Sequence, residues 1–153
     1  MLVHPGKYAE ILIASDATVT GVDISPRMIE LAKERNRQAG NFFVHNPSHP
    51  LPMLENTTFD IVISALAMHY IEDWTTTIRE FYRVLKPKGL LAISIEHPFF
   101  EFNYFLSKQY FKVEPGKCYW NNFGKRIEMN SYRRHAGKCN PHNCQWFLYR
   151  PVN

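Results

Sequence analysis

Hydrophobic positions in the first hundred residues alternate between helical spacing and short, nearly continuous apolar runs. Helical spacing occurs over residues 7–14, 26–39 and 74–85, and strand-like runs cover 18–23, 41–45, 59–65 and 90–96. Strands without polar alternation, separated by amphipathic helices, are typical of a parallel sheet that helices cover on both faces. The pattern therefore predicts an α/β fold built on a doubly wound parallel sheet.

The helix boundaries are marked by capping residues. Ser25 before Pro26 suits an N-cap followed by proline in the first turn, and Asp73 suits the N-cap of the later helix. Gly40 is placed as the C-terminal stop of the helix that Ser25 caps. Residues 86–89 (Lys-Pro-Lys-Gly) are placed as the turn that ends the helix that Asp73 caps. These signals define the most clearly marked helix, over 26–39.

Length and composition restrict the class of protein. The chain has 153 residues, 45% hydrophobic and 21% charged, which is typical of one globular domain and excludes a disordered or coiled-coil chain. No apolar run approaches the roughly 20 residues that a membrane span needs, and no basic and apolar leader opens the chain. Three cysteines cannot all pair, which argues against a secreted disulfide scaffold. We expect a cytoplasmic protein without a membrane partner.

Charge and aromatic content divide the chain into two zones. Residues 1–101 carry 9 Lys and Arg against 12 Asp and Glu, whereas residues 102–153 carry 9 against 2. The second zone also holds 12 of the 22 aromatic residues and all three cysteines. A basic, aromatic segment suits nucleic-acid binding, but no recognition motif supports that interpretation. We therefore predict a first domain over 1–101 and a lid or substrate-side extension over 102–153.

Asp23 is the sharpest candidate for chemistry. Ligands of parallel sheets bind beyond the carboxyl ends of the strands, and Asp23 ends the predicted strand over 18–23. It follows Gly6 by 17 residues, close to the interval of about 20 between a glycine turn and a ribose-binding acid. A second interpretation makes Asp23 part of the helix cap around Ser25, and the spacing alone does not decide between the two.

Three segments carry a family resemblance. Residues 19–32 resemble the second-strand segment of class I S-adenosylmethionine-dependent methyltransferases, and residues 59–70 resemble their fourth-strand motif. Residues 81–89 resemble the Arg-Val-Leu-Lys-Pro-Gly-Gly signature that precedes the fifth strand. The similarity extends from residue 6 to about 134 and is greatest to the type 11 group of small-molecule methyltransferases. It implies a Rossmann-like fold, S-adenosylmethionine as cofactor, and methyl transfer to a small-molecule acceptor.

The resemblance also implies positions for the adenosine part of the cofactor. Gly6 matches the last glycine of the family's glycine-rich turn, and Asp23 matches the acid that binds the ribose. Ile24 matches the apolar residue beside the adenine, and Asn46 falls near the residue that contacts the adenine amine.

The methionine part and the acceptor involve later residues. Ala65 and Leu66 match the end of the fourth strand, beside the methionine part of the cofactor. His69 and His97 follow the carboxyl ends of neighbouring strands, where either would serve as the base if the acceptor must lose a proton. Pocket lining or helix capping is the alternative role for both histidines.

The aromatic and cysteine-containing tail adds weaker candidates. Trp120 and Tyr132 either close the acceptor pocket or pack as structural residues. The tail also holds potential zinc ligands, but their spacing lacks a Cys-x-x-Cys pair, so we predict no metal site. These potential ligands are Cys118, His135, Cys139, His142 and Cys144.

The chain departs from the family pattern at both ends. The family's first strand and glycine-rich turn should precede Lys7, yet only residues 1–5 stand before Gly6, and Gly-x-Gly occurs nowhere. We therefore expect an incomplete sheet, truncated at the front and altered at the back, with exposed apolar strand edges. Residues 145–149 or a second copy of the chain are candidates to cover those edges. The alternative function is a non-catalytic remnant that acts as an interaction or structural protein.

Overall fold

The computed structural model describes residues 6–109, 114–122 and 125–133. The chain divides into two compact units, Met1–Pro52 and Met53–Asn153, and each is described here by itself. The boundary expected at residue 101 from charge and aromatic content stays a prediction, because composition and compactness measure different properties of a chain.

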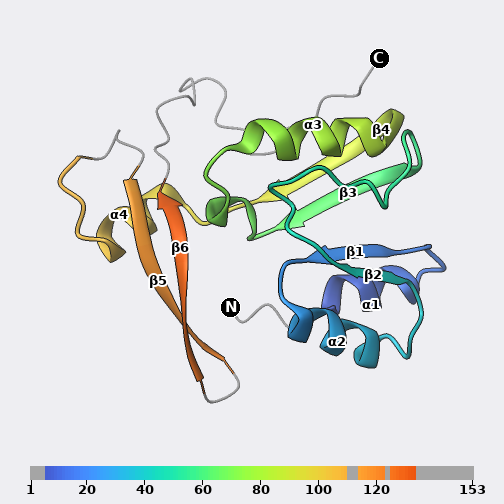
Figure 1. The fold of residues 1–153 in the computed structure, drawn as a ribbon, viewed down its shortest axis with the longest axis horizontal. Coiled ribbons are helices and arrows are strands. Elements are labelled where there is room, and N and C mark those ends of the chain that lie inside the picture. The colour runs from blue at the N-terminus through green and yellow to red at the C-terminus, as the bar shows by residue number, and fades with distance from the viewer. Residues whose placement is uncertain (1–5, 110–113, 123–124, 134–153) are drawn as a thin grey trace. The chain divides into compact units, whose positions relative to one another are not determined.

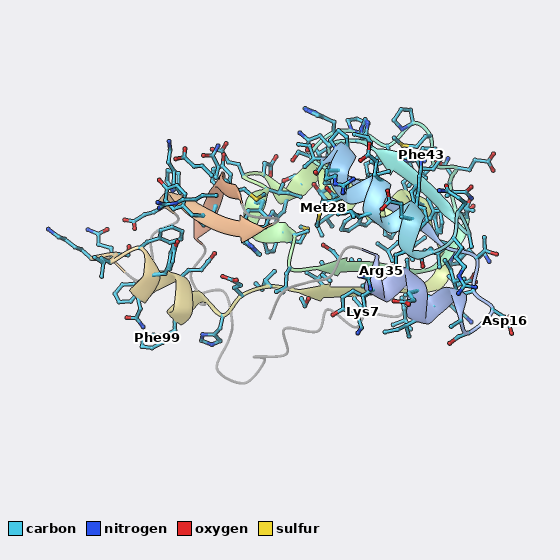
Figure 2. All side chains as sticks on the ribbon, turned by 90° about the horizontal axis from the view of Figure 1, so that it is seen from below. Lys7, Asp16, Met28, Arg35, Phe43 and Phe99 are labelled. Atoms are coloured by element: carbon cyan, nitrogen blue, oxygen red, sulfur yellow. The ribbon has the colours of Figure 1, made fainter. Side chains whose placement is uncertain are left out.

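The first unit pairs two parallel strands with two helices (Figure 1). Its elements are α1 (Lys7–Ile13), β1 (Thr20–Asp23), α2 (Pro26–Arg35) and β2 (Asn41–Val44). Ile29 and Ala32 of α2 bury against Phe42 of β2, and this cluster forms the small core of the unit. Arg35, labelled in Figure 2, donates a hydrogen bond of 3.3 Å to Glu10 and so links α2 to α1.

Helix α2 begins as its sequence predicts but ends early. The Ser25 hydroxyl accepts the backbone N–H of Met28, and Pro26 occupies the first turn. The predicted stop at Gly40 is wrong, because the helix ends at Arg35 with Asn36 as its C-cap. The Asn36 amide donates to the carbonyl of Ala32 at 2.7 Å and so satisfies the helix end locally. Gly40, with φ of 88°, instead lies in the turn that leads into β2.

The second unit combines a parallel strand pair with an antiparallel hairpin (Figure 1). Its first elements are β3 (Phe59–Ala65), the 3₁₀ helix η1 (Met68–Tyr70), α3 (Trp74–Val84) and β4 (Leu85–Ser94). They are followed by α4 (Pro98–Tyr104), β5 (Glu114–Asn122) and β6 (Lys125–Arg133). As predicted, the Asp73 carboxylate caps α3 by accepting the N–H of Thr75 at 2.9 Å.

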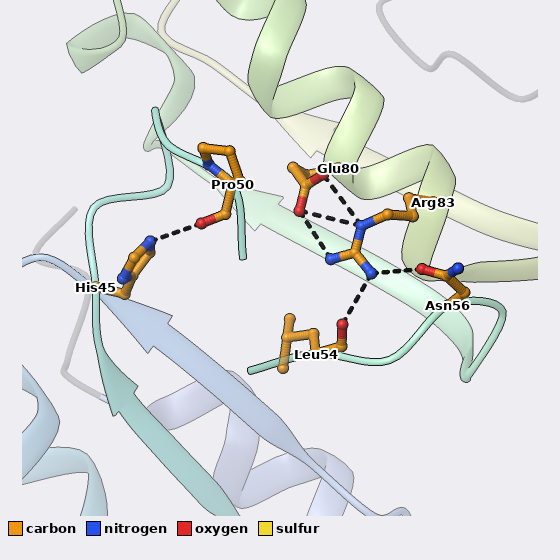
Figure 3. Close-up of polar contacts among 6 residues, drawn as sticks. All are labelled: His45, Pro50, Leu54, Asn56, Glu80 and Arg83. Carbon is orange, nitrogen blue, oxygen red and sulfur yellow. Dashed lines mark hydrogen bonds and ion pairs between the residues drawn. The ribbon is translucent and has the colours of Figure 1, made fainter. Parts of the chain in front are cut away.

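A hydrogen-bonded arginine joins α3 to the loop before β3. The Arg83 guanidinium donates to Glu80 on its own helix, to the carbonyl of Leu54 at 2.8 Å and to Asn56 at 2.7 Å (Figure 3). Because a guanidinium presents several donors in a fixed plane, one side chain holds the loop at two points while it stays bound to its own helix.

Strand β4 differs from its prediction at its start. It begins at Leu85, which pairs with Phe59, whereas Ile61 pairs with Leu90, so residues 86–89 form a bulge within the strand. Ile61 is 50% exposed and Ile63 is 44% exposed. One face of the β3–β4 pair therefore presents apolar side chains, in line with the incomplete sheet that the sequence predicts.

The described strands form three separate two-stranded sheets, with the pairs β1–β2, β3–β4 and β5–β6. The four strands expected to be parallel form two parallel pairs, so the prediction of an incomplete parallel α/β sheet is confirmed. In the part of the chain that the structure describes, no helix has the length and apolar character required to cross a membrane.

Candidate functional site

The carboxyl end of β1 presents an acidic and an apolar side chain next to each other. Asp23 Oδ1 accepts the backbone N–H of Ser25 at 2.8 Å, which fixes the carboxylate in the turn between β1 and α2. Burial raises the pKa of Asp23 above its usual value, and the Ser25 N–H opposes that shift by stabilising the charged form. Ile24 is 58% exposed, so its apolar surface is available to a flat ligand. Both interpretations of Asp23 remain open, because the turn bond engages one oxygen of the two.

Strand β2 places Asn46 close to the same edge of the sheet. Asp23 is in register with Val44, and the Asp23 carbonyl accepts the N–H of His45 at 2.9 Å. Asn46 Oδ1 accepts the N–H of Ser48, and the His45 ring contacts the carbonyl of Pro50 at 2.9 Å (Figure 3). The first unit therefore brings Asp23 and Asn46 to the ends of adjacent strands.

Gly6 lies elsewhere in the first unit. It adopts a φ of 71° at the N-cap of α1, a conformation that favours glycine. A Cβ built on Gly6 would lie 2.9 Å from the Cα of Ala32 and from the side-chain nitrogen of Asn36, near the end of α2. Asp23 precedes the beginning of α2, so the contacts of Gly6 are at the opposite end of that helix.

The carboxyl end of β3 is held by β4. Ala65 is in register with Ser94, and the N–H of Leu66 donates to the Ser94 carbonyl at 2.9 Å. Leu66 has a φ of 51°, in the left-handed region, and its side chain is half-buried. These contacts fix the turn that leads from β3 towards η1.

The two predicted histidines lie in contrasting environments. His69 in η1 is 5% exposed, and neither ring nitrogen has a hydrogen-bond partner among the described residues. Burial lowers the pKa of His69 to about 4, so its imidazole is neutral at pH 7. His97 is exposed, and its Nδ1 accepts the N–H of Phe99 at 3.2 Å as the N-cap of α4. The capping role considered for His97 is therefore present, and His69 lines a cavity.

This cavity, called the His69 cavity below, has a volume of about 170 Å³ and lies within the second unit. It is formed by η1, the segment after β4, helix α4 and the β5–β6 hairpin. Its described lining residues are His69, Tyr70, Glu96, Glu101, Tyr104, Phe105, Cys118, Tyr119 and Ser131.

Buried polar groups connect α4 to the hairpin at the His69 cavity. The Ser131 hydroxyl donates to Glu101 Oε1 at 3.1 Å, and both side chains are buried. Burial raises the pKa of the Cys118 thiol, and the nearby carboxylates of Glu96 and Glu101 raise it further, while a hydrogen bond with Tyr70 opposes the shift. Sequence reasoning missed both glutamates, although Glu101 interrupts an aromatic stretch directly after the predicted strand.

Of the remaining tail candidates, Tyr132 has a side chain that the structure describes. Tyr132 pairs with Pro115 and alternates with Ser131, so strand geometry places its side chain on the opposite face of the hairpin. Trp120 belongs to β5, and its side chain lies outside the described part of the structure. The other potential zinc ligands, His135, Cys139, His142 and Cys144, lie outside the described residues.

The elements described above match a known family. The methyltransferase domain family matches residues 3–93, which is more than half of the chain. The chain belongs to this family. The match covers β1, β2, β3 and nearly all of β4, and thus the four strands of both parallel pairs.

Curated relatives of this methyltransferase domain match slightly more than half of the chain. A demethylmenaquinone methyltransferase of Chlamydia pneumoniae is 36% identical over 90 residues, covering 58% of this chain and 39% of that protein. The Staphylococcus aureus protein of the same name is 34% identical over 81 residues, covering 52% and 33%. The chain thus spans little more than a third of the length of these curated relatives.

Solved structures extend the fold comparison to both units. An S-adenosylmethionine-dependent methyltransferase from Mesorhizobium loti has a TM-score of 0.62 at 22% identity, covering 86% of this chain and 64% of that one. The PH0226 protein from Pyrococcus horikoshii has a TM-score of 0.61 at 27% identity, covering 86% and 63%. The Rossmann-like fold class of this methyltransferase domain is thereby confirmed.

Proposed function

We propose that this methyltransferase domain transfers a methyl group from S-adenosylmethionine to a small-molecule acceptor. The observation that carries the proposal is the Asp23 carboxylate, fixed at the end of β1 within the segment that the family matches. A ribose diol offers two hydrogen-bond donors, and an ionised carboxylate is an acceptor with about four lone-pair sites. The exposed Ile24 supplies the apolar surface that an adenine ring requires. The residues present thus fit the adenosine part of this cofactor.

Each candidate residue receives a role in this proposal. Asp23 accepts hydrogen bonds from the ribose, Ile24 packs on the adenine, and the Asn46 side chain contacts the adenine amine. Ala65 and Leu66 line the methionine part from the end of β3. Gly6, at the start of α1, keeps the cofactor-binding role that the family resemblance implies for the last glycine of the glycine-rich turn. When bound, the cofactor supplies a methyl group on a positively charged sulfur, already activated for in-line attack.

The acceptor is assigned to the His69 cavity, with different roles for the two histidines. His69 is a weak base, because burial lowers its pKa to about 4, and it contributes a neutral, polar wall. His97 does not line this cavity but a second hollow, with Phe99, Asn103 and Tyr104. Its Nδ1 accepts the N–H of Phe99, so its Nε2 is the nitrogen that would receive a proton from an acceptor extending past Tyr104, which lines both.

Calorimetric titration with S-adenosylmethionine tests the proposal. Asp23→Ala should weaken binding by about 2–4 kcal/mol, because hydrogen bonds to a charged group are lost. Asp23→Asn should weaken it less, since the amide retains one acceptor oxygen. Glu34→Gln is the matched control, because Glu34 is exposed on α2 in the same unit.

Two results would contradict the proposal in different ways. Equal affinity of the wild type and Asp23→Ala would remove Asp23 from the cofactor site. Absence of binding by the wild type would instead favour the non-catalytic alternative, an interaction or structural protein that retains the family fold.

A further inference from the structure

Two carboxylates converge on the His69 cavity from different elements. Glu96 lies just beyond the carboxyl end of β4, and Glu101 lies on α4. Glu96 has neither a hydrogen-bond nor an ion-pair partner among the described residues, and no described lining residue is a lysine or arginine. The neutral His69 adds no positive charge at pH 7. The described wall of the cavity is therefore negatively charged.

Aromatic rings complete the wall beside these carboxylates. Tyr70, Tyr104 and Phe105 line the cavity, and aromatic faces attract ammonium groups through their quadrupole. The ring of Tyr119 has other partners. The Arg126 guanidinium lies 3.9 Å from its ring centre, and its hydroxyl donates to Glu128. Strand alternation places Tyr119 on the face of the hairpin opposite Cys118.

His69 provides an independent indication of a ligand. A neutral imidazole carries one N–H donor and one acceptor nitrogen, and both lack a partner among the described residues. Unsatisfied polar groups at this depth are uncommon in folded proteins, and a donor on a bound molecule would satisfy the acceptor nitrogen.

The size of the cavity restricts the ligand to a small group. Its 170 Å³ equals the liquid volume of roughly six water molecules and is below the roughly 300–1,000 Å³ of sites for drug-sized ligands. A small ammonium group with a short substituent fits this volume.

We propose that the His69 cavity binds a small organic cation, an ammonium group that the methyl acceptor carries apart from the atom that is methylated, with Glu96 as its counter-ion. The assignment of this cation as the acceptor rests on the proposed methyl transfer, whereas the binding of a cation does not.

Binding of a charged and a neutral molecule of the same shape tests the proposal. Choline and 3,3-dimethylbutan-1-ol differ by a quaternary nitrogen in place of a carbon, and each is titrated into the full chain by calorimetry. Choline should bind at least about fivefold more tightly, as expected for a partly desolvated cation near aromatic rings and a carboxylate. Glu96→Gln should reduce that preference, because Glu101 and the aromatic rings remain, and Glu55→Gln, at an exposed loop position in the same unit, should retain it in full.

The Cys118 thiol supplies a second measurement that does not depend on affinity. With Cys139 and Cys144 replaced by serine, the pH dependence of alkylation reports the pKa of Cys118 alone. Choline should lower this pKa, because a cation offsets the carboxylates that raise it, and Glu96→Gln should lower it without any ligand. The neutral analogue should leave it unchanged.

The outcomes separate this inference from the proposed function. Equal binding of choline and its analogue would overturn the cation site, and an undiminished preference for choline in Glu96→Gln would overturn Glu96 as its counter-ion. S-adenosylmethionine binding is measured without choline, so a separate titration decides whether Asp23→Ala weakens it. Cation binding without cofactor binding would retain the site and reject its role in methyl transfer.

Discussion

The two candidate sites are built over very different distances along the chain. At the end of β1, Asp23 is fixed by Ser25 and Ser25 by Met28, over two and three residues. At the His69 cavity, Ser131 bonds to Glu101 across 30 residues, and the lining extends from His69 to Ser131. The first site is a property of a short segment, whereas the second exists only once a helix and a hairpin have packed. Disruption should therefore have small, local effects at β1 and larger effects at the cavity.

The largest effect is expected from the protonation of His69. Its pKa is about 4 in the folded chain against 6.5 as an ordinary value, so the unfolded state takes up the proton first as the pH falls. The stability that the neutral His69 contributes is fully present above pH 6.5. As the pH falls towards 4, its loss lowers the free energy of unfolding by about 3 kcal/mol. Urea unfolding at pH 7.5, 5.5 and 4 measures this change. His69→Phe should lack this part of the pH dependence and be no less stable at pH 7.5, since it removes two unpartnered nitrogens.

The control for His69 is His49→Gln, because His49 is exposed in the other unit and this variant should follow the wild type. If the free energy of unfolding depended on pH in the same way in His69→Phe and the wild type, His69 would be solvated. The expected difference between the β1 turn and the His69 cavity would then be weaker.

A smaller effect is expected from the hydrogen bond between α4 and the hairpin. Ser131→Ala removes a donor to the buried Glu101 carboxylate, so the free energy of unfolding should fall by about 1.5–3 kcal/mol. Asn130→Ala, at the exposed neighbouring position on β6, should change it by less than about 0.5 kcal/mol. Equal effects of the two substitutions would mean that Glu101 does not depend on Ser131.

The contrast in distance also explains what the sequence could predict. The Ser25 and Asp73 caps, the four parallel strands and the position of Asp23 at a strand end follow from short segments, and all are found where expected. The end of α2 was missed because Asn36 makes contacts that the preference for glycine does not anticipate. Glu96 and Glu101 were missed because their environment depends on the hairpin, for which the sequence had given no strand prediction.

The smallest effect is expected at the turn after β1. Ser25→Ala should destabilise the first unit by about 1 kcal/mol, through loss of the cap on the N–H of Met28. Ser25→Asp should restore most of that loss, because aspartate is an equally good N-cap. Thermal unfolding of the three proteins measures the difference. If Ser25→Ala lost as much stability as Ser131→Ala, the expected difference between local and long-range contacts would be wrong.

Leu66 shows that the end of β3 retains conformational strain. Its φ of 51° is a left-handed conformation that costs a residue with a Cβ about 1–2 kcal/mol, and two contacts with Ser94 hold it there. Glycine would adopt the same backbone without that cost. The fold thus gives up stability to carry an apolar side chain at this turn, and residues held in such conformations cluster where proteins bind ligands or perform chemistry. Leu66 is consequently a position at which selection for a more stable chain and selection for an apolar wall would favour different amino acids.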